Sequence, residues 1–259
     1  MTNAARSGGR VTRLIDIVFP GDTNHHGTLF GGIGLADMDK VAFIAASRHG
    51  HCDFVTASCD RIDFEAPARL GEIVELTARV VRVGRRSLGV ETDLVAEHVL
   101  TGERRRCTRG VFTMVAIGEP YASGGALPPL DAETVEHADD DGLRMVEMVF
   151  PDQTSHYGSL YGGNALAAMG KAAFVAATRR SRKAVVMASS QRVDFMSQVR
   201  TGEVIELCAR VDRVGRSSMT IAVELHAENL LTGERRLAGH GCFVMVALGE
   251  NERPVAIEA

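Results

Sequence analysis

The sequence predicts an α+β protein built from two copies of one domain, and three features lead to this prediction. A stretch beginning at Phe19 recurs at Phe150, an offset of 131 residues, and half of the positions between Phe19 and Phe64 match their partners. Each copy orders its elements as a strand, an apolar helix and a run of strands, which favours α+β over a parallel βαβ fold. A segment rich in glycine, proline and acidic residues separates the copies.

The first elements of each copy are predicted from their hydrophobic periodicity. Residues 11–19 alternate apolar and polar positions and are rich in β-branched residues, which predicts a strand. A loop is expected over residues 20–28, where glycine, aspartate and asparagine gather. From Gly31 to about residue 47, apolar residues cover most of the helical surface, which is typical of a buried helix.

Four more strands are predicted in the first copy, and short glycine-containing turns between them favour antiparallel pairing. In one of them, Val74, Leu76 and Ala78 alternate with polar residues, as expected for a sheet with one covered face. The second copy repeats this order. The four predicted strands cover residues 54–64, 72–83, 87–99 and 104–117.

The domain limits follow from the break in this pattern. Residues 119–141 contain paired glycines, paired prolines and an acidic run, so they predict a linker. We expect one domain over residues 1–118 and a second over 142–259. Each is long enough to bury a core of its own.

Composition excludes several classes of function. The net charge of −4 gives no reason to expect a nucleic-acid partner. No apolar run reaches the length of a membrane span, and residues 1–10 lack the apolar segment of a secretory signal. The cysteines have neither zinc nor disulfide spacing, which indicates free thiols in a reducing cytoplasm. They are Cys52, Cys59, Cys107, Cys208 and Cys242.

A motif at the loop and helix start carries a family resemblance. It reads D-x-N-x-x-G-x-x-F-G-G-x-x-L-x-x-M-D and comprises Asp22, Asn24, Gly27, Phe30, Gly31, Gly32, Leu35, Met38 and Asp39. With the later turn Val83-Gly84-Arg85, it is similar to the acyl-CoA thioesterases of the hotdog fold. The duplicated form resembles the cytosolic double-hotdog acyl-CoA hydrolases.

The resemblance implies a tandem double hotdog, in which each central helix is wrapped by an antiparallel sheet. It implies that the two halves join their sheets side by side into one continuous sheet. The implied activity is hydrolysis of fatty acyl-CoA to fatty acid and CoA in cytoplasmic fatty acid metabolism, with no cofactor beyond the CoA of the substrate. The implied assembly is a homotrimer of double hotdogs.

Thioester hydrolysis needs a base, donors for the developing oxyanion and an apolar slot for the acyl chain. The paired glycines Gly31-Gly32 and Gly162-Gly163 are expected to expose N–H groups at helix N-termini, where the helix dipole favours negative charge. The alternative is that these glycines only let the helix pack closely on the sheet.

Asp39 is the expected general base, because burial within an apolar helix raises the pKa of a carboxyl group. The alternative is a structural ion pair with Lys40 or an arginine. The family that the chain resembles places a polar amide in this loop, so the resemblance implies that Asn24 orients the water or the thioester oxygen. The alternative is an Asx-type turn. His25 and its equivalent His156 are expected to be surface or hydrogen-bonding residues.

The differences between the copies suggest which half can be catalytic. The second copy has Ser155 in place of Asn24 and Gly170 in place of Asp39. In the family that the chain resembles, a composite site takes its loop and glycines from one hotdog and its carboxylate from the other. The site built on Gly170 lacks a base, so the expected catalytic site joins Asp39 to Ser155 and Gly162-Gly163.

Two basic turns are candidate CoA-binding elements, because guanidinium and hydroxyl groups can bind phosphates. They contribute Arg85 and Ser87 in the first copy, and Arg216 and Ser218 in the second. The alternative is a glycine-containing bulge with solvated arginines. No metal-ligand spacing is present, so no metal is expected.

Two other functions are considered. The main alternative is a non-catalytic acyl-CoA-binding or regulatory hotdog protein, which Ser155 and Gly170 favour. A hotdog hydratase is less favoured, because Gly27 stands where the hydratase motif needs its histidine.

Overall fold

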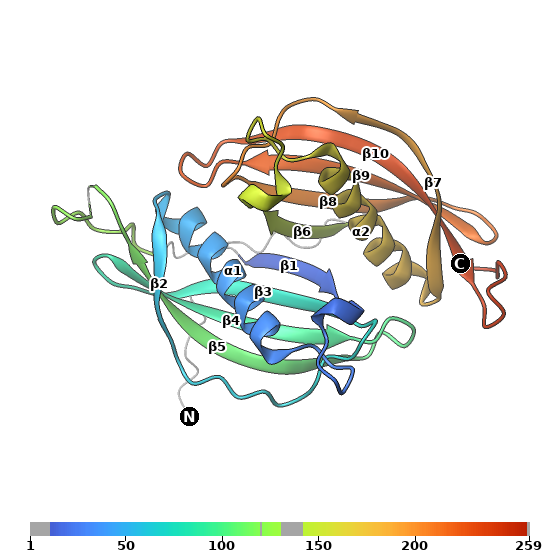
Figure 1. Cartoon of the computed structure of the whole chain (residues 1–259), viewed down its shortest axis with the longest axis horizontal. Coiled ribbons are helices and arrows are strands. Elements are labelled where there is room, and N and C mark those ends of the chain that lie inside the picture. Colours follow the sequence, from blue (N-terminus) through green and yellow to red (C-terminus); the bar gives the residue numbers. More distant parts are fainter. Residues whose placement is uncertain (1–10, 120, 131–141, 258–259) are drawn as a thin grey trace.

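The computed structural model describes residues 11–119, 121–130 and 142–257, and it consists of two similar units (Figure 1). Residues 1–10 and the acidic part of the predicted linker lie outside the described residues. The elements of the first unit are β1 (Thr12–Ile17), η1 (Pro20–Asp22), α1 (Gly31–Gly50), β2 (Phe54–Cys59), β3 (Ile73–Val83), β4 (Ser87–Glu97) and β5 (Arg104–Ala116).

The second unit repeats this order, as the sequence repeat predicts. Strand β2 is shorter than predicted and ends at Cys59, after a register shift between Thr56 and Ser58. The elements of the second unit are β6 (Leu143–Met148), η2 (Pro151–Gln153), α2 (Gly162–Ser181), β7 (Ala184–Phe195), β8 (Val204–Val214), β9 (Ser218–Glu228) and β10 (Arg235–Leu248).

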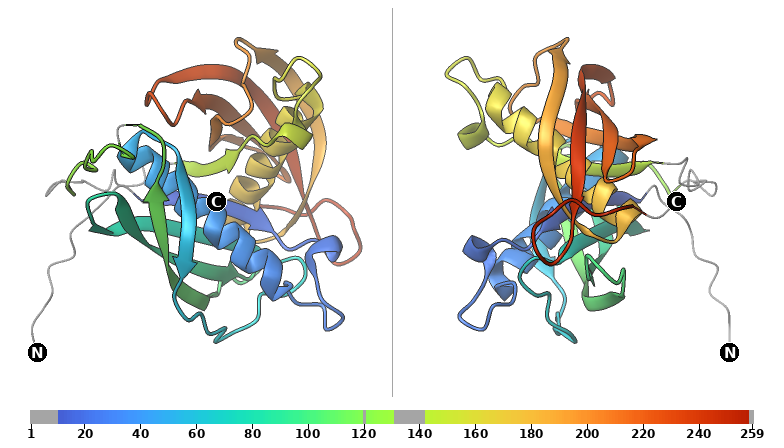
Figure 2. Two further views of the ribbon diagram at one scale, coloured as in Figure 1. Left: turned by 60° about the vertical axis from the view of Figure 1, so that its left-hand side comes forward. Right: turned by 90° about the vertical axis from the view of Figure 1, so that its right-hand side faces the viewer.

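Each unit forms an antiparallel five-stranded sheet that curls around one long helix, which confirms the predicted tandem double hotdog (Figure 2). The strand orders are β1-β3-β4-β5-β2 and β6-β8-β9-β10-β7. The expectation of one continuous sheet is wrong. The edge strands β1 and β6 lie next to each other, but no hydrogen-bonded ladder joins them among the described residues.

Side chains of the two edge strands, instead of backbone ladders, link the units. In β1, Leu14 packs in the core of its own unit, whereas the next residue, Ile15, packs in the core of the other unit. The equivalent residues of β6 do the same in reverse, with Met145 in its own core and Val146 in the opposite one. Each unit therefore buries part of its apolar surface only when the other is present.

Ion pairs at the ends of the helices also cross the seam. Arg48, in the last turn of α1, bonds Glu228 of β9, and its equivalent Arg179 of α2 donates to Glu97 of β4 at 2.7 Å. Arg182 donates to the other oxygen of Glu97, also at 2.7 Å. Because the Glu97 side chain is only 1% exposed, these bonds hold a charge that water does not reach.

A second carboxylate at the seam makes the fold sensitive to acid. Burial alone would raise the pKa of Glu75, but hydrogen bonds and positive charge from Arg179 and Arg104 hold it below its ordinary value of 4.5. A carboxyl group whose pKa is lowered in the folded state stabilises that state above its unfolded pKa, and this stabilisation disappears as the pH falls through the folded value.

We therefore expect the free energy of unfolding to decrease as the pH falls below about 4.5, and Glu75→Gln to reduce this decrease. Urea denaturation at a series of pH values measures both effects. Asp63→Asn is the control, since Asp63 is 67% exposed in its pair with Arg61. An acid sensitivity of Glu75→Gln equal to that of the wild type would contradict the assignment.

Candidate active site

Asp39 lies on the side of α1 that faces strand β2. Thr56 Oγ1, on β2, donates a 2.6 Å hydrogen bond to Asp39 Oδ1. Asp39 is half-buried, so the prediction of a fully buried carboxylate is wrong. The reason is that the helix is not covered on all sides, because strand β2 leaves the side of α1 that carries Asp39 accessible. The alternative ion pair with Lys40 does not form either, because Lys40 Nζ lies 2.8 Å from Asp37 Oδ1.

Thr56 is a candidate functional residue that the sequence reasoning missed. A carboxylate bonded to a hydroxyl, with no cationic partner among the described residues, keeps lone pairs free to accept a proton from water. A comparison of the two copies of the repeat could have identified Thr56. Its equivalent is Met187, so the two copies differ at this position as well as at Asp39.

The second unit has lost both members of this pair. Gly170 replaces Asp39 and Met187 replaces Thr56. A Cβ atom added at Gly170 would lie 2.9 Å from Cε of Met187, so the methionine occupies the space in which a carboxylate would stand. An apolar side chain thus replaces the polar pair, and this position of the second unit offers no base.

The helix starts are open to a ligand. Helix α2 begins at Gly162 without a side-chain cap, and a Cβ atom added there would meet no atom within 4 Å. A Cβ atom at Gly31 would lie 3.6 Å from the Phe64 ring, an ordinary contact. Close packing on the sheet therefore does not require these glycines. The first N–H groups of a helix lack intrahelical partners, so they can bind an oxyanion.

The second glycine of each pair lies against the aromatic residue that precedes the helix. A Cβ atom would come within 2.7 Å of the Phe30 ring at Gly32, and within 2.9 Å of the Tyr161 ring at Gly163. These positions exclude larger residues unless the rings move. The expected role of the four glycines in binding the oxyanion stays a prediction.

Asn24 holds its own loop together. Its Oδ1 accepts hydrogen bonds from the backbone N–H groups of His26 at 2.9 Å and Thr28 at 3.3 Å, and its Nδ2 donates to Thr28 Oγ1 at 2.9 Å. This geometry favours the Asx-turn alternative. His25 is exposed and lies against the ring of His26, in keeping with a surface residue.

Ser155 serves the second loop in a similar way. Its Oγ lies 3.2 Å from Ser159 Oγ and accepts a 3.4 Å hydrogen bond from the N–H of Tyr157. The loop that carries Ser155 starts at Phe150, and Lys40 Nζ stands 5.9 Å from the centre of the Phe150 ring. The structure thus places Phe150, at the start of this loop, near Lys40 of α1, and no hydrogen bond joins Asp39 to Ser155 among the described residues.

An apolar cavity adjoins the start of α2. Its volume is about 360 Å³, and apolar side chains supply most of its wall. A cavity of this kind suits an acyl chain, because binding removes the apolar surface of the chain and that of the cavity wall from water. The lining includes Leu160, Gly162, Ala165, Phe195, Met196 and Val199.

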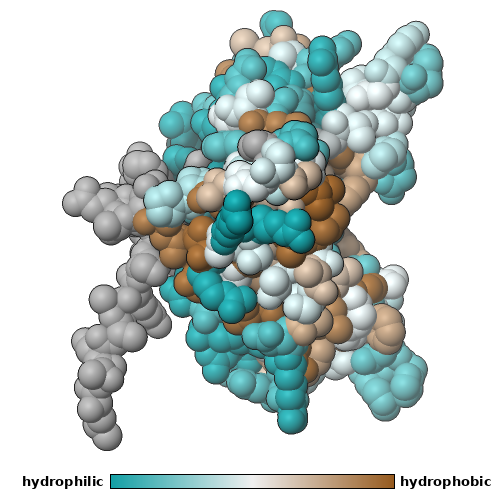
Figure 3. Space-filling model, turned by 90° about the vertical axis from the view of Figure 1, so that its left-hand side faces the viewer, coloured by the Kyte–Doolittle hydropathy of each residue, from teal (hydrophilic) through white to brown (hydrophobic). Residues whose placement is uncertain are grey.

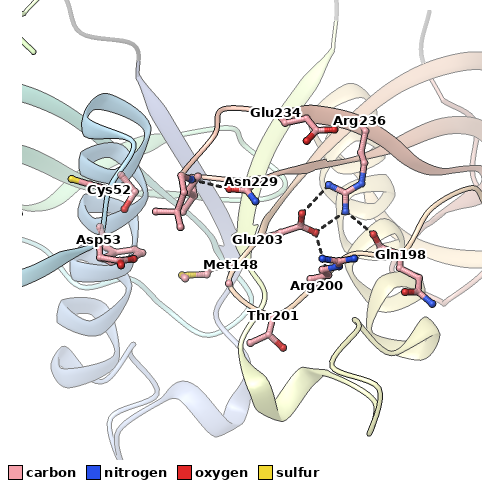
Figure 4. A pocket seen from close by; sticks show the side chains of 15 residues that line it. Cys52, Asp53, Met148, Gln198, Arg200, Thr201, Glu203, Asn229, Glu234 and Arg236 are labelled. Carbon is pink, nitrogen blue, oxygen red and sulfur yellow. Dashed lines mark hydrogen bonds and ion pairs between the residues drawn. The ribbon is translucent and has the colours of Figure 1, made fainter. Parts of the chain in front are cut away.

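A more polar cavity of about 640 Å³ lies at the seam between the units (Figure 4). Cys52 and Asp53 of the first unit stand on one side, and Glu203 and Arg236 of the second stand on the other. Gln198 lines this cavity as well as the apolar one, so the two adjoin. A ligand with an apolar and a polar part could occupy both.

The charges in the seam cavity are held in place. Burial alone would raise the pKa of Glu203, but hydrogen bonds from Arg236 and from the backbone N–H of Arg200 lower it overall.

Ser47, in α1, is 1% exposed and lines the same cavity, and its hydroxyl has no hydrogen-bond partner among the described residues. Burial raises the pKa of the Cys52 thiol, against a hydrogen bond with Tyr121 that lowers it.

The two basic turns have partners within the chain. Arg85 Nη2 donates to the carbonyl of Gly124 at 2.7 Å, and the carbonyl of Arg85 accepts from Leu127 at 2.8 Å. The carbonyl of Arg216 likewise accepts from Ile257 at 2.8 Å. The turns therefore hold the segments that follow the last strand of each unit. A CoA-binding role for these turns stays a prediction.

The serines of these turns also act locally. The N–H of Gly84 donates to the carbonyl of Ser87, and that of Gly215 to the carbonyl of Ser218, each at 2.7 Å. These bonds close tight connections between neighbouring strands, as the alternative of a glycine-containing turn predicts. Residues 121–130, part of the predicted linker, accordingly pack on the first unit, where Leu127 is buried.

Three further expectations concern cysteines, metals and membranes. All five cysteines are free thiols, as predicted. Within the described ranges, no cluster of three or more histidine, cysteine or acidic side chains is arranged to hold a metal ion. In the same part of the chain, no helix is both long and apolar enough to cross a membrane.

Comparison with known proteins now places the chain in a family. The sequence model of the Thioesterase superfamily matches it twice, over residues 26–103 and 157–234, once in each unit. The chain therefore belongs to the thioesterase superfamily, as a tandem member with two hotdog units. The crystal structure of an acyl-CoA hydrolase from Agrobacterium tumefaciens is 58% identical with a TM-score of 0.87, and the match covers 95% of this chain and 98% of that one.

Curated relatives match either about half of this chain or nearly all of it. The uncharacterized acyl-CoA thioester hydrolase YkhA of Bacillus subtilis is 38% identical over 46% of this chain and 72% of its own length. The rat cytosolic acyl coenzyme A thioester hydrolase is 21% identical over 93% of this chain and 75% of its own. Mouse acyl-coenzyme A thioesterase 11 is 24% identical over 93% of this chain, which spans only 48% of the mouse protein.

Proposed function

We propose that the protein is an acyl-CoA thioesterase that hydrolyses fatty acyl-CoA to the fatty acid and CoA. The observation that carries the proposal is the Asp39–Thr56 pair, a carboxylate with a hydroxyl partner in a chain of the thioesterase superfamily. The acyl-CoA hydrolase from Agrobacterium tumefaciens, which matches nearly the whole chain, supports the same activity.

The proposed reaction uses groups from both units. A water molecule held by Thr56 loses a proton to Asp39 and attacks the thioester carbon. Backbone N–H groups at Gly162 and Gly163 stabilise the oxyanion, because they lie at the positive end of the α2 dipole. The carbon–sulfur bond then breaks, and the CoA thiolate leaves and takes up a proton.

The substrate would extend through both cavities. The apolar cavity beside Gly162 receives the acyl chain, and the polar seam cavity receives a hydrophilic part of CoA. Ser155 shapes the loop that precedes α2. Each double hotdog then has one working site, since the equivalent position in the second unit carries Gly170 and Met187.

The same replacement favours a second candidate function for the other composite site. With Met187 in the place of a base, that site could bind acyl-CoA without hydrolysing it. If both sites behaved in this way, the protein would be a binding or regulatory hotdog protein.

Release of free thiol from a panel of acyl-CoA esters, from short to long chains, separates these functions. We expect the full chain to release CoA from at least one ester, because Asp39 is available as a base and the apolar cavity beside Gly162 can receive an acyl chain. Calorimetry on the same esters reports binding. Binding without thiol release across the whole panel would replace the thioesterase with the binding protein.

The assembly and location are also part of the proposal. We expect a homotrimer of double hotdogs, because the family resemblance implies it and the outer strands expose large apolar side chains. The face in Figure 3 shows separate apolar patches among hydrophilic side chains. The relatives named cytosolic support a cytoplasmic location. Exposed large apolar side chains on or after the outer strands β2 and β7 include Val55, Phe64, Val186, Met187, Phe195 and Met196.

Light scattering coupled to size-exclusion chromatography tests the assembly. We expect a mass of three chains at micromolar concentration, because exposed apolar side chains are removed from water on association. A mass of one chain under these conditions would remove the trimer but leave the catalytic proposal intact.

A further inference from the structure

The polar seam cavity of about 640 Å³ contains a hydroxyl group that the proposed reaction does not use. Ser47, near the end of α1, lines this cavity and is 1% exposed. Its Oγ makes no hydrogen bond to a described residue. Buried polar groups of folded proteins almost always have a partner, so a molecule bound in the cavity is the expected partner of this hydroxyl.

The serine has a cost for the folded chain. In the interior of a helix, serine is less favourable than alanine, and a buried hydroxyl without a partner adds the cost of its lost hydration. The two residues before Ser47 are Ala45 and Ala46, and both are buried, so alanine would suit the same surroundings. Proteins keep such unfavourable residues mainly at functional sites.

The position of Ser47 relates the seam cavity to the proposed base. Residues four apart in a helix are neighbours on its surface, so Asp39, Phe43 and Ser47 follow one another along α1. Phe43 and Ser47 both line the cavity, whereas Asp39 lies one turn before Phe43. At a rise of about 1.5 Å per residue, Ser47 stands about 12 Å from Asp39 along the helix axis.

This spacing suits the arm of CoA that carries the thioester. That arm, pantetheine, contains two amide groups in series after the sulfur atom. An extended chain advances about 3.3–3.6 Å per peptide-like unit, and with its additional methylene group the second amide lies roughly 10 Å from the sulfur. Because the Cα–Cβ bonds of a helix tilt toward its N-terminus, the Ser47 side chain starts back toward Asp39 and shortens the remaining distance.

Other groups at the wall also favour a neutral part of the ligand. Arg236 pairs with Glu203 at 2.7 Å, and the backbone N–H of Arg200 donates to the same carboxylate at 2.7 Å (Figure 4). Asn229 Oδ1 accepts a 2.9 Å hydrogen bond from the N–H of Leu231, and its Nδ2 is a further neutral donor at this wall. Neutral donors of this kind suit the carbonyl oxygens of amides.

From this arrangement we propose that Ser47 binds the pantetheine arm of the substrate by donating a hydrogen bond to the carbonyl of its second amide. The inference rests on the proposed thioesterase function and names the part of CoA that the seam cavity receives. It also implies selectivity for the thiol. A site built to hydrogen-bond a polar group discriminates against analogues that lack the group, so thioesters of shorter thiols should be poorer substrates.

Three thioesters of one acyl group test the proposal: the CoA ester, the pantetheine ester without the nucleotide, and the N-acetylcysteamine ester, which keeps only the first amide. We expect Ser47→Ala to raise KM about fivefold for the first two, the loss of one neutral hydrogen bond, and to leave the third unchanged. Thr178→Ala is the matched control. Thr178 is the equivalent of Ser47 in α2, is 1% exposed and also lacks a hydrogen-bond partner, and its replacement should leave all three KM values unchanged.

Ser47→Ala should be at least as stable to urea as the wild type, because the hydroxyl makes no hydrogen bond within the described chain. An unchanged KM for the CoA ester would overturn the proposal, and so would an equal rise for the N-acetylcysteamine ester. If no ester releases thiol, the thioesterase function fails, and calorimetry with free CoA still tests Ser47. About fivefold weaker binding by Ser47→Ala supports the contact, whereas equal affinity, or no binding by the wild type, rejects it.

Discussion

Asp39→Asn is expected to lower the turnover of acyl-CoA by a factor of about 100 or more. The amide has nearly the same shape as the carboxylate and can still accept the hydrogen bond from Thr56, which is 2.6 Å long in the wild type. It cannot accept a proton from water. The loss should therefore appear in kcat, measured by thiol release, with little change in the affinity for the substrate.

Asp37→Asn is the matched control for this variant. Asp37 is a half-buried acid in the same helix, two residues away, and it pairs with Lys40. Its replacement should leave turnover nearly unchanged. Thr56→Val should lower kcat as well, because the hydroxyl that orients Asp39 and the water is removed. Wild-type turnover in Asp39→Asn would exclude Asp39 as the base, even if the protein is a thioesterase.

Glu97→Ala is expected to reduce the free energy of unfolding by about 3–5 kcal/mol, the cost of breaking a buried ion pair by removing one partner. Glu97 is 1% exposed and bonds Arg179 and Arg182 of the other unit. Without it, Arg179 would keep one acidic partner among the described residues, Glu75. Because these bonds cross the seam, their loss weakens the contact between the two units as well as the fold of each one.

Denaturant unfolding measures this change, and Asp93→Ala is its control. Asp93 pairs with Arg109 on the same sheet, but the Arg109 side chain is 41% exposed. Exposed pairs contribute about 1 kcal/mol or less, since water screens them and the side chains lose entropy. If Glu97→Ala cost no more than Asp93→Ala, the seam ion pairs would not stabilise the fold.

The sequence alone determined the duplication, the helix and most of the strands. These follow from local patterns: period-two alternation in residues 72–83, an apolar helix after Gly31 and glycine at the turns. It also singled out Asp39, because an acid within an apolar helix is conspicuous. The hydrogen bonds of Asn24 within its own loop could also be predicted from the sequence, since Asx turns join residues that are close in the chain.

Only the tertiary structure decided the features that depend on residues far apart in the chain. Thr56 gains its importance because β2 lies opposite α1, and Met187 because its methyl group occupies the space above Gly170. The separation of the sheets, the cavities at the seam and the arginine cluster around Glu75 depend on how two units pack. Periodicity fixes which face of a strand is buried, but not which distant side chain lies against it, so these contacts appear only in the folded chain.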